Sequence, residues 1–374
     1  MSSFKHSLVR FAASAVVAGL AACSSPDATG PSPAPDEPSL RRDEGRTATV
    51  SVMTRNMYIG ADVDAVIAAI AGGDPAAAFA ALGTAIQTLS LTDYPTRARG
   101  FAEEIGRRRP DVVGLQEVSK IDITIPGDPA IDIHLDFLPV LLHELELRHL
   151  PYAVARRNAN FTVAPYGGAV SVADEDVILV NTSRVNVLGT MGQVFNNNMP
   201  PVGGLAIQRG WVGVDAVIGG QRYSIVSTHP ESGSNPGLAL LRAAQLDEIV
   251  TALAGAPRAI VIGDLNDGRG SPMYQVLQGG GFTDAWPALR PGVAGLTCCN
   301  APDLSNPSPA FTQTLDYVFA KGLGNGKPGL QGSIELVGIR PWERLQGPAF
   351  PIWPSDHAGV WAQLLTPAGR EGDR

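Results

Sequence analysis

Residues 261–266 read Val261-Ile262-Gly263-Asp264-Leu265-Asn266, an apolar run that ends in an acidic and an amide side chain. The run is apolar enough to predict a buried strand. Alternate side chains of an extended backbone share a face, so Asp264 and Asn266 are expected to point the same way. The carboxylate could accept a proton or hold a water molecule, and the amide could orient a phosphate oxygen. A simple turn after a core strand is the alternative interpretation.

The same arrangement, a polar side chain at the end of an apolar run, recurs along the chain. The other examples are Thr54-Arg55-Asn56, Leu115-Gln116-Glu117, Ser227-Thr228-His229 and Ser355-Asp356-His357. A strand that ends in a polar side chain places it at the rim of a sheet, where clefts form. Carboxylates, amides and imidazoles at several such rims suit a hard cation and an activated water molecule. This combination predicts metal-dependent cleavage of a phosphate ester.

Several of these side chains suit particular roles. Glu117 could ligate Mg²⁺, which prefers oxygen ligands, although a surface acid after a core strand is the plain alternative. His357 is a natural general base near neutral pH, and Asp316 could hold its tautomer. Its neighbour Asp356 could serve the cation. His229 adds a donor for charge on phosphoryl oxygens, although a lone histidine is more often structural.

Bulk composition describes a globular chain with a sizeable core. The 374 residues are 44% hydrophobic and 17% charged, enough for one large or two ordinary domains. The 42 glycines and 30 prolines indicate many loops. The net charge of −8 gives no general attraction to nucleic acid or anionic lipid, although a local basic rim could suffice.

The amino terminus has the features of an export signal. Lys5 and Arg10 precede an apolar stretch, residues 11–22, that is too short to span a bilayer. It runs into Leu20-Ala21-Ala22-Cys23, which resembles the bacterial lipoprotein cleavage box and would make Cys23 the lipidated first residue of the mature protein. An ordinary signal peptide that contains a cysteine is the alternative.

We therefore expect a signal peptide over residues 1–22 and a proline-rich tether over residues 23–46. The protein would be an exported lipoprotein, anchored to a membrane at the periplasmic or outer cell surface. Its contact with the membrane would be through the N-terminal lipid only.

Two adjacent cysteines remain, Cys298 and Cys299. In an oxidising compartment they either pair with each other or stay reduced. A vicinal disulfide closes a strained ring, so both states stay open. Because no further cysteine or histidine stands near them in the sequence, they are not expected to form a zinc site.

The remaining pattern predicts one domain over residues 47–366 and a polar tail over residues 367–374. Strands are expected at residues 50–53, 111–115, 152–155, 176–180, 213–218, 223–227, 258–262, 315–320 and 359–364. Helices are expected within residues 62–89, with a break at 72–75, and at 96–109, 135–147 and 246–253. Strands mixed with helices, without sustained βαβ alternation in the second half, indicate a mixed-sheet sandwich with helices outside.

Six elements in order resemble the endonuclease/exonuclease/phosphatase superfamily, which includes deoxyribonuclease-I-like nucleases, neutral sphingomyelinases and inositol-phosphate phosphatases. They are Arg55-Asn56, Gln116-Glu117-Val118, Ser227-Thr228-His229, Gly263-Asp264-Leu265-Asn266, Leu315-Asp316-Tyr317-Val318 and Ser355-Asp356-His357. No single motif is specific, but six in this order are a strong signal over residues 50–364. The resemblance implies an α/β fold: a four-layered α/β sandwich of two mixed β-sheets flanked by helices.

The resemblance also implies roles for the polar side chains. The catalytic residues would be His357, Asp316, Asp264, His229 and Asn266, and the metal ligands would be Glu117, Asn56 and Asp356. Glu117 would be the principal ligand of Mg²⁺, with Mn²⁺ or Ca²⁺ as alternatives. His357, oriented by Asp316, would activate the water molecule with Asp264 nearby. The two remaining catalytic side chains would hold and polarise the phosphate.

The chain departs from the superfamily pattern at two places. His229 is followed by Pro230-Glu231, where many relatives have an apolar residue. The alanine-rich insertion over residues 62–89 is long, and such insertions sit beside the cleft, where they would influence substrate choice. The segments 196–198 and 209–211 are candidate substrate contacts, with rim loops of no substrate role as the alternative, and Tyr317 is expected to pack behind the site.

We expect a monomeric phosphodiesterase that acts on nucleic acid, DNA or RNA, or on a phospholipid head group. The alternative is a non-catalytic cell-surface binding protein on the same scaffold. The complete set of Asn, Glu, His and Asp side chains argues against that alternative, because a binding protein has no need for a general base beside a metal ligand.

Overall fold

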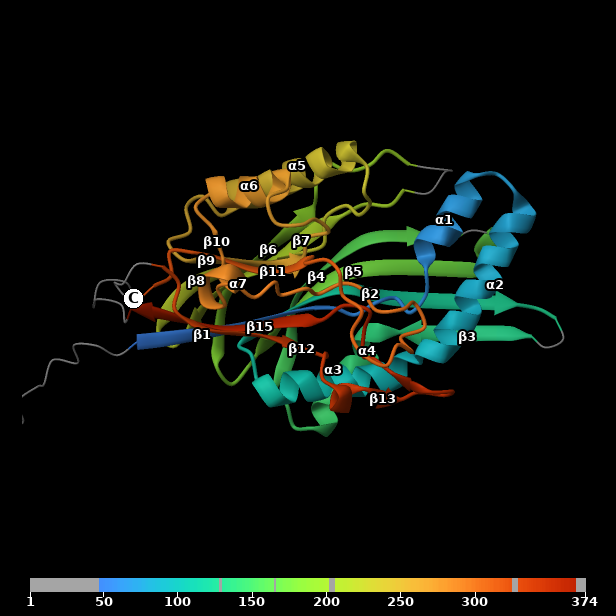
Figure 1. Ribbon diagram of the computed structural model, residues 1–374, viewed down its shortest axis with the longest axis horizontal. Helices are drawn as coiled ribbons and strands as arrows, with labels where there is room; N and C mark the ends of the chain where they lie inside the picture. Colours follow the sequence, from blue (N-terminus) through green and yellow to red (C-terminus); the bar gives the residue numbers. More distant parts are fainter. Residues whose placement is uncertain (1–46, 128–129, 165, 202–205, 325–328, 368–374) are drawn as a thin grey trace, which may run out of the picture. The chain divides into compact units, whose positions relative to one another are not determined.

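Two β-sheets packed face to face form the centre of the computed structural model (Figure 1), which describes residues 47–127, 130–164, 166–201, 206–324 and 329–367. The chain divides into two units, Met1–Glu44 and Gly45–Arg374, and everything described belongs to the second. The expected signal peptide, the tether with Cys23 and residues 368–374 of the tail lie outside the described residues.

The first sheet has the strand order β12-β15-β1-β2-β5-β4, and β3 pairs with β2 beside that path. Its strands are β1 (Thr47–Asn56), β2 (Val112–Ile125), β3 (Ile131–Asp136), β4 (Tyr152–Val163), β5 (Val170–Asn181), β12 (Gly332–Val337) and β15 (Gly359–Pro367). Strands β1 and β2 run parallel and their other pairings are antiparallel, so the sheet is mixed.

The second sheet has the order β10-β11-β9-β8-β7-β6. Its strands are β6 (Val185–Val194), β7 (Gly210–Ile218), β8 (Gln221–Thr228), β9 (Ala259–Asp264), β10 (Thr283–Asp284) and β11 (Asp316–Lys321). This sheet is also mixed, because β8 and β9 are parallel while β9 and β11 are antiparallel. A separate short ribbon pairs β13 (Leu345–Gln346) with β14 (Pro351–Ile352).

Helices cover the outer faces of both sheets (Figure 1), apart from the short helix Ala285–Leu289, whose Ala285 and Trp286 belong to the hydrophobic cluster between the sheets. They are α1 (Val63–Ala71), α2 (Pro75–Thr92), α3 (Tyr94–Arg108), α4 (Phe137–Leu147), α5 (Pro236–Ala252), α6 (Pro272–Gly279) and α7 (Ala285–Leu289). Short 3₁₀ turns occupy Tyr166–Gly168 and Pro341–Glu343. Among the described residues, no helix combines the length and apolarity that crossing a membrane requires.

Strand β9 shows how the sequence builds the layers. Ile260 and Ile262 are buried between the two sheets, where Val52 of β1 meets them in one hydrophobic cluster. Val261, which points to the opposite face, packs instead with Leu246 of α5 in a second cluster. Neighbouring residues of a strand face opposite sides, so an apolar run of this kind is buried on both faces.

A third cluster buries the outer face of the first sheet under α3 and α4, with Phe101 and Leu141 against Met53. Helices, two sheets and helices thus form four layers. The expected four-layered α/β sandwich is confirmed.

The structure corrects some expected boundaries. Strand β2 continues to Ile125 rather than ending at Leu115, because a bulge carries the chain past Glu117 and pairing with β5 resumes at Val118. The helix expected from residue 135 begins at Phe137, since the preceding residues form β3. Strand β6 was not expected, and its mostly exposed side chains carry no apolar pattern.

The alanine-rich insertion forms two helices, as expected. Asp74 caps α2 by accepting hydrogen bonds from the backbone of Ala76, and Pro75 occupies the first helical position. Gly73, with φ of 75°, makes the turn between α1 and α2. The expected break over residues 72–75 is confirmed.

Candidate active site

The polar side chains meet where the two sheets come closest. Gln116 at the end of the parallel β1–β2 pairing donates from Nε2 to Ser227 Oγ of the other sheet at 2.9 Å. Gly114 faces the same serine, and a Cβ atom there would lie 2.4 Å from Ser227 Oγ. Only glycine therefore allows this approach, which brings the end of β1 beside the end of β9.

Glu117 lies in the β2 bulge rather than beyond the end of a strand. Its φ is 55°, a left-handed conformation that turns its side chain out of the ladder. Its Oε1 accepts from Asn56 Nδ2 at 2.9 Å, and its Oε2 accepts from the backbone of Ile59 at 2.9 Å. The carboxylate is thus held in one orientation, in the middle of the site.

Asn56 connects the carboxylates of the two sheets. Its Nδ2 donates to Glu117 Oε1 and also to Asp264 Oδ2, the latter at 3.0 Å. Its Oδ1 accepts from the backbone of Tyr58 at 2.8 Å, which distinguishes the oxygen from the nitrogen of the amide. The nitrogen therefore faces the two acids, and metal ligation through Oδ1 stays a prediction.

His357 stands between two carboxylates. Its Nδ1 donates to Asp316 Oδ2 at 2.8 Å, and its Nε2 lies 3.6 Å from Asp264 Oδ2. Burial by itself lowers the pKa of the imidazole, but Asp316, Asp264 and Asp356 raise it well above the ordinary value. The expected positioning of His357 by Asp316 is present in the structure.

Asp264 is kept ionised in spite of its burial. Burial raises the pKa of this carboxyl, but the positive charge of His357 acts against it, and the pKa lies below the ordinary value. The hydrogen bond from Asn56 and one from the backbone of Asn266 act in the same direction. The side chain therefore offers a charged acceptor to a neighbouring water molecule or proton.

His229 is held neutral by its neighbours. Burial and then Arg209 lower its pKa to about 3. Arg209 Nη1 lies 3.2 Å from His229 Nδ1. Because a guanidinium only donates, Nδ1 must accept and the ring proton sits on Nε2, 3.7 Å from Asp264 Oδ2. The geometry supplies the donor that the sequence predicted for this residue.

The unusual Glu231 after His229 has a partner in the site. Its Oε1 lies 3.7 Å from Arg209 Nε, and its backbone nitrogen donates to Gln245 Oε1. The departure from the superfamily pattern therefore helps to hold the arginine that faces His229. Arg209 was only a weak candidate in the sequence, where nothing marked its contact with a residue twenty positions away.

Glu117 and Asp356 form a pair of acids suited to a cation. Burial raises the pKa of Glu117, and the negative charge of Asp356 raises it further. Burial also raises the pKa of Asp356. Two partly buried carboxylates that repel each other are stabilised by a divalent ion, and oxygen donors of this kind suit Mg²⁺. The donor set fits the expected metal.

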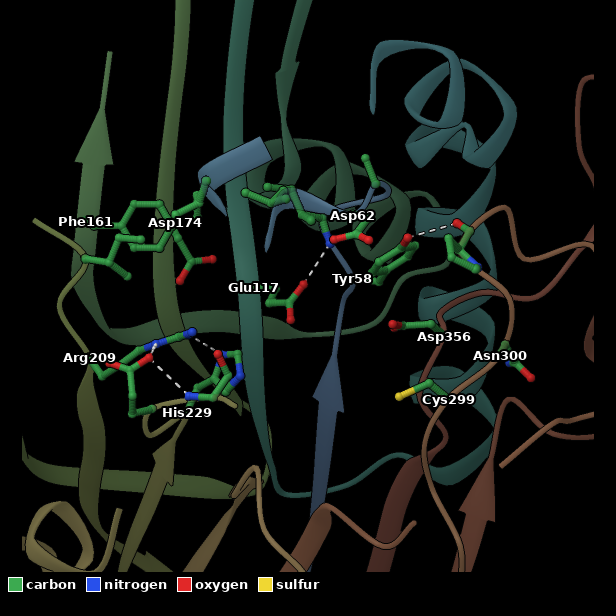
Figure 2. Close-up of a pocket in the computed structure, with 18 residues that line it drawn as sticks. Tyr58, Asp62, Glu117, Phe161, Asp174, Arg209, His229, Cys299, Asn300 and Asp356 are labelled. Carbon is green, nitrogen blue, oxygen red and sulfur yellow. Dashed lines mark hydrogen bonds and ion pairs between the residues drawn. The ribbon is translucent and has the colours of Figure 1, made fainter. Parts of the chain in front are cut away.

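A pocket of about 360 Å³ opens above these groups. Figure 2 shows Glu117 in its middle, Arg209 and His229 on one side, and Asp356 and Cys299 on the other. Ile67 of α1 is also part of the lining, so the insertion does lie beside the pocket. Its influence on substrate choice stays a prediction.

Asn266 is the main correction among the expected site residues. It lies beyond the end of β9 with φ of 55°, so it does not continue the alternation of an extended strand. Its Nδ2 donates to the Pro230 carbonyl at 3.0 Å, and its backbone donates to Asp264 Oδ1 at 3.0 Å. Asparagine tolerates this left-handed conformation, and a role in holding phosphate stays a prediction.

Of the remaining sequence predictions, the one for Tyr317 agrees with the structure, whereas the suggested substrate contacts at Asn196 and Asn197 do not gain support. Tyr317 packs behind the site, as expected, and its hydroxyl donates to the carbonyls of Asp267 and Thr314. Asn196 and Asn197 hold Glu248 through backbone and side-chain hydrogen bonds. Those two amides therefore stabilise a loop in the structure, which favours the interpretation without a substrate role.

Two buried arginines support the segments that carry the site: Arg55, which the sequence motif contained without a role, and Arg97, which sequence reasoning missed. Arg55 pairs with Glu104 of α3 at 3.0 Å and donates to the backbone oxygen of His357. Arg97 donates to the Met57 carbonyl at 2.6 Å and to the Thr92 carbonyl at 2.9 Å. Arg55 stands beside Asn56 at the end of β1, and this position next to a candidate ligand is the sequence signal that could have revealed its role.

Comparisons with known proteins agree with the fold and with the arrangement of the site. Residues 83–357 match the model of the Endonuclease/Exonuclease/phosphatase family. No curated protein matches the chain significantly. An endonuclease/exonuclease/phosphatase structure from Beutenbergia cavernae DSM 12333 is 21% identical, with a TM-score of 0.56, covering 86% of this chain and 72% of that chain.

Two further solved structures share the fold. A family protein from Bacteroides thetaiotaomicron is 12% identical, with a TM-score of 0.55, covering 87% of this chain and all of that chain. TDP2 of D. rerio, complexed with a single-strand DNA product, is 19% identical with a TM-score of 0.51, covering 84% of this chain and 98% of that chain.

Proposed function

Because the chain belongs to the endonuclease/exonuclease/phosphatase family, we propose that it is a metal-dependent phosphoesterase that hydrolyses a phosphodiester. The observation that carries the proposal is the hydrogen-bonded series Glu117–Asn56–Asp264 beside the pair formed by His357 and Asp316. It combines a metal-binding carboxylate, an ionised acceptor and an oriented imidazole around one pocket. Those three components are sufficient for attack of water on phosphorus.

Glu117 and Asp356 would hold Mg²⁺, with Asn56 as an additional oxygen ligand. When bound, the ion supplies a Lewis acid that neutralises charge on the phosphoryl oxygens.

Asp264 and His357 would take the proton of the attacking water molecule together. Asp264 stays ionised and can hold the water, while His357 Nε2 lies 3.6 Å from the same carboxylate oxygen. Two groups this close titrate as one unit. His229 and Arg209 would stabilise negative charge that develops on the phosphoryl oxygens. Both are hydrogen-bond donors, His229 through its Nε2–H and Arg209 through its guanidinium. Asn266 would help to hold the phosphate.

The substrate would be nucleic acid or a phospholipid head group. The structure of D. rerio TDP2 with a DNA product supports the first class. The net charge of −8 and the acids Asp62, Asp174 and Glu231 around the pocket favour the second, because they repel a polyanion. The lipoprotein features of the amino terminus support an exported enzyme anchored at a membrane surface.

The first experiment assays the full-length chain with bis-p-nitrophenyl phosphate, plasmid DNA and sphingomyelin, in Mg²⁺ or in EDTA. We expect turnover that requires Mg²⁺ and that falls by about 10²–10⁴-fold in His357→Ala, the range that a general acid or base contributes. His143→Ala, an exposed histidine of α4, is the matched control and should retain full activity.

The substrate that turns over fastest would identify the branch of the family. Turnover that survives in a folded Glu117→Ala, His357→Ala double variant would contradict the assignment of the site. Silence on all three substrates, from a folded protein that binds Mg²⁺, would favour the non-catalytic binding protein.

A further inference from the structure

The two adjacent cysteines lie beside the imidazole of the site, which their positions in the sequence did not indicate. Cys299 Sγ is 3.9 Å from His357 Nε2. The sulfur atoms of Cys298 and Cys299 and a ring nitrogen of His357 all lie within 4.8 Å of one another. No histidine stands near the pair in the sequence, but the fold brings one beside it, because the chain returns after almost sixty residues.

Backbone pairing holds the cysteines in this position. Cys298 forms an antiparallel bridge with His357 and another with Gln313. On either side of that bridge, Asn300 donates to the Asp356 carbonyl and Ala358 donates to the Thr297 carbonyl, each at 2.8 Å. The segment carrying the thiols and the segment carrying the imidazole are thus fixed to each other by main-chain hydrogen bonds.

We propose that Cys298, Cys299 and His357 form a binding site for a soft divalent cation of the Zn²⁺ or Cd²⁺ class when the two thiols are reduced, and that an ion bound there withdraws His357 from catalysis. Thiolate and imidazole ligands suit such ions, and three protein ligands with an open fourth position are common. Tetrahedral Zn–S and Zn–N bonds place sulfur and nitrogen about 3.5 Å apart. The 3.9 Å separation needs only a small movement of the Cys299 side chain.

The surroundings of His357 favour ligation through Nε2. Its Nδ1 donates to Asp316 at 2.8 Å, the carboxylate partner that metal-binding histidines typically have. Cys299 is exposed and lines the pocket, so an ion in solution reaches the site, whereas Cys298 is buried. The donor set of sulfur and nitrogen differs from the oxygen set of Glu117 and Asp356, so the two sites select different ions.

Binding requires the reduced form, since the structure joins the two sulfur atoms in a disulfide. A water-soluble phosphine opens the disulfide by taking oxygen from water, which yields the phosphine oxide and two thiols. Binding of one M²⁺ ion then releases the two thiol protons as both sulfurs become thiolates, and it also displaces the proton that His357 carries on Nε2. The binding step is independent of the proposed phosphoesterase activity, and only its inhibitory consequence rests on that activity.

The test uses the full-length chain with Cys23→Ser, which leaves Cys298 and Cys299 as its two cysteines. The protein is reduced with the phosphine, desalted without oxygen and titrated with Cd²⁺ against a competing chelator. The thiolate-to-cadmium absorbance band reports binding. We expect one ion per reduced chain and none per oxidised chain.

Variants separate this site from simple capture by two thiols. Cys299→Ser should abolish the tight binding. His357→Gln removes a direct ligand and should weaken binding by at least about tenfold, since loss of even a group that only orients a ligand costs that much. His143→Gln, an exposed histidine on α4, is the control and should bind as the parent does. Equal affinity in the parent and His357→Gln would overturn the proposal, as would the absence of tight binding to the reduced chain.

The catalytic consequence is measured separately. Cd²⁺ should lower phosphodiester turnover by at least about tenfold in the reduced parent, and added chelator should restore it, because a bound His357 cannot exchange a proton. The Cys298→Ser, Cys299→Ser double variant should lose this inhibition. Inhibition that persists in the double variant would place the ion at the oxygen ligands and overturn the inhibitory role. An inactive parent would contradict the proposed function, while the titration would still decide the metal site.

Discussion

Asp174 and Asp176 lie on β5, and both carboxyl groups are buried. Burial raises the pKa of Asp174 to about 6, although Arg209 and a hydrogen bond from Asn160 Nδ2 at 3.0 Å act against it. Burial also raises the pKa of Asp176 well above its ordinary value. Carboxyl groups with strongly raised pKa values cluster at functional sites. Asp174 fits this pattern, because it lines the pocket together with Glu117.

Asp174→Asn should stabilise the protein in a pH-dependent way. A carboxyl with a raised pKa holds its proton in the folded state and loses it on unfolding, so wild-type stability falls as pH rises from about 4 to about 6. The variant lacks this loss. Its advantage in free energy of unfolding should grow across that range and level off at about 2–3 kcal/mol.

Urea unfolding at a series of pH values measures the difference. Asp247→Asn, an exposed acid of α5, is the control and should show no such gain. A constant difference between Asp174→Asn and the wild type across the whole range would contradict the raised pKa.

Glu117→Gln should separate metal binding from folding. The variant removes one of two partly buried acids that repel each other, so in EDTA it should unfold at the same temperature as the wild type or higher. Mg²⁺ at a hundredfold excess over its Kd should stabilise the wild type by about 2.7 kcal/mol and leave the variant unchanged. Thermal unfolding with and without Mg²⁺ measures both effects. Equal Mg²⁺ stabilisation of the two proteins would exclude Glu117 as a ligand.

Helix α3 supports the site although it contributes no group to the chemistry. Arg97 on α3 is fully buried, and its guanidinium contacts three carbonyl groups, those of Thr92, Met57 and Pro354. Met57 follows the end of β1, and Pro354 precedes the segment that carries Asp356. One side chain thus holds together the two loops that supply metal ligands from opposite ends of the domain.

Arg97→Lys should therefore destabilise the fold and the site together. A lysine ammonium cannot reach the carbonyls that the planar guanidinium spans, so at least one charged hydrogen bond is lost, on the order of 3 kcal/mol. The free energy of unfolding from urea titration and the Kd for Mg²⁺ should both worsen. Arg99→Lys, on the same helix and close to the surface, is the control. Unchanged Mg²⁺ affinity in Arg97→Lys would show that the loops hold their positions without it.

The charge of the protein as a unit bears on the substrate. A net charge of −8, with acids around the pocket, repels a polyanion over the Debye length and leaves a zwitterionic head group almost unaffected. The same charge gives no general pull toward an anionic membrane. The lipid anchor expected at Cys23 would then supply the contact with a membrane surface, and this stays a prediction.

Added salt should raise the rate on DNA, which is the opposite of its effect on a basic nuclease, and should leave the rate on sphingomyelin unchanged. Salt screens the repulsion, so kcat/KM for plasmid DNA should rise with NaCl, by less than about tenfold. The value for sphingomyelin in neutral micelles should stay constant. Initial rates from low to physiological salt measure both. A steep fall of the DNA rate with salt would instead reveal a local basic surface that releases counterions.

Sequence patterns were sufficient for the layers, and they named side chains that the structure brings together around one pocket, whose catalytic and metal-binding roles stay predictions. An apolar run such as residues 259–262 is buried on both faces, and a polar residue at its end reaches a rim wherever the strand lies in the sheet. Asp264, the last residue of β9, could therefore be found without knowing its partners. Helix breaks also depend on local chemistry, which explains the correct prediction around Gly73 and Pro75.

Features that depend on two distant segments could not be read from the chain. The bulge at Glu117, the left-handed turn at Asn266 and the tautomer of His229 each follow from neighbours that only packing brings close. The contact of Cys299 with His357 is the clearest case. Local sequence determines which face a side chain takes, since the backbone period is local, whereas the position of a group relative to another segment depends on how the two sheets pack.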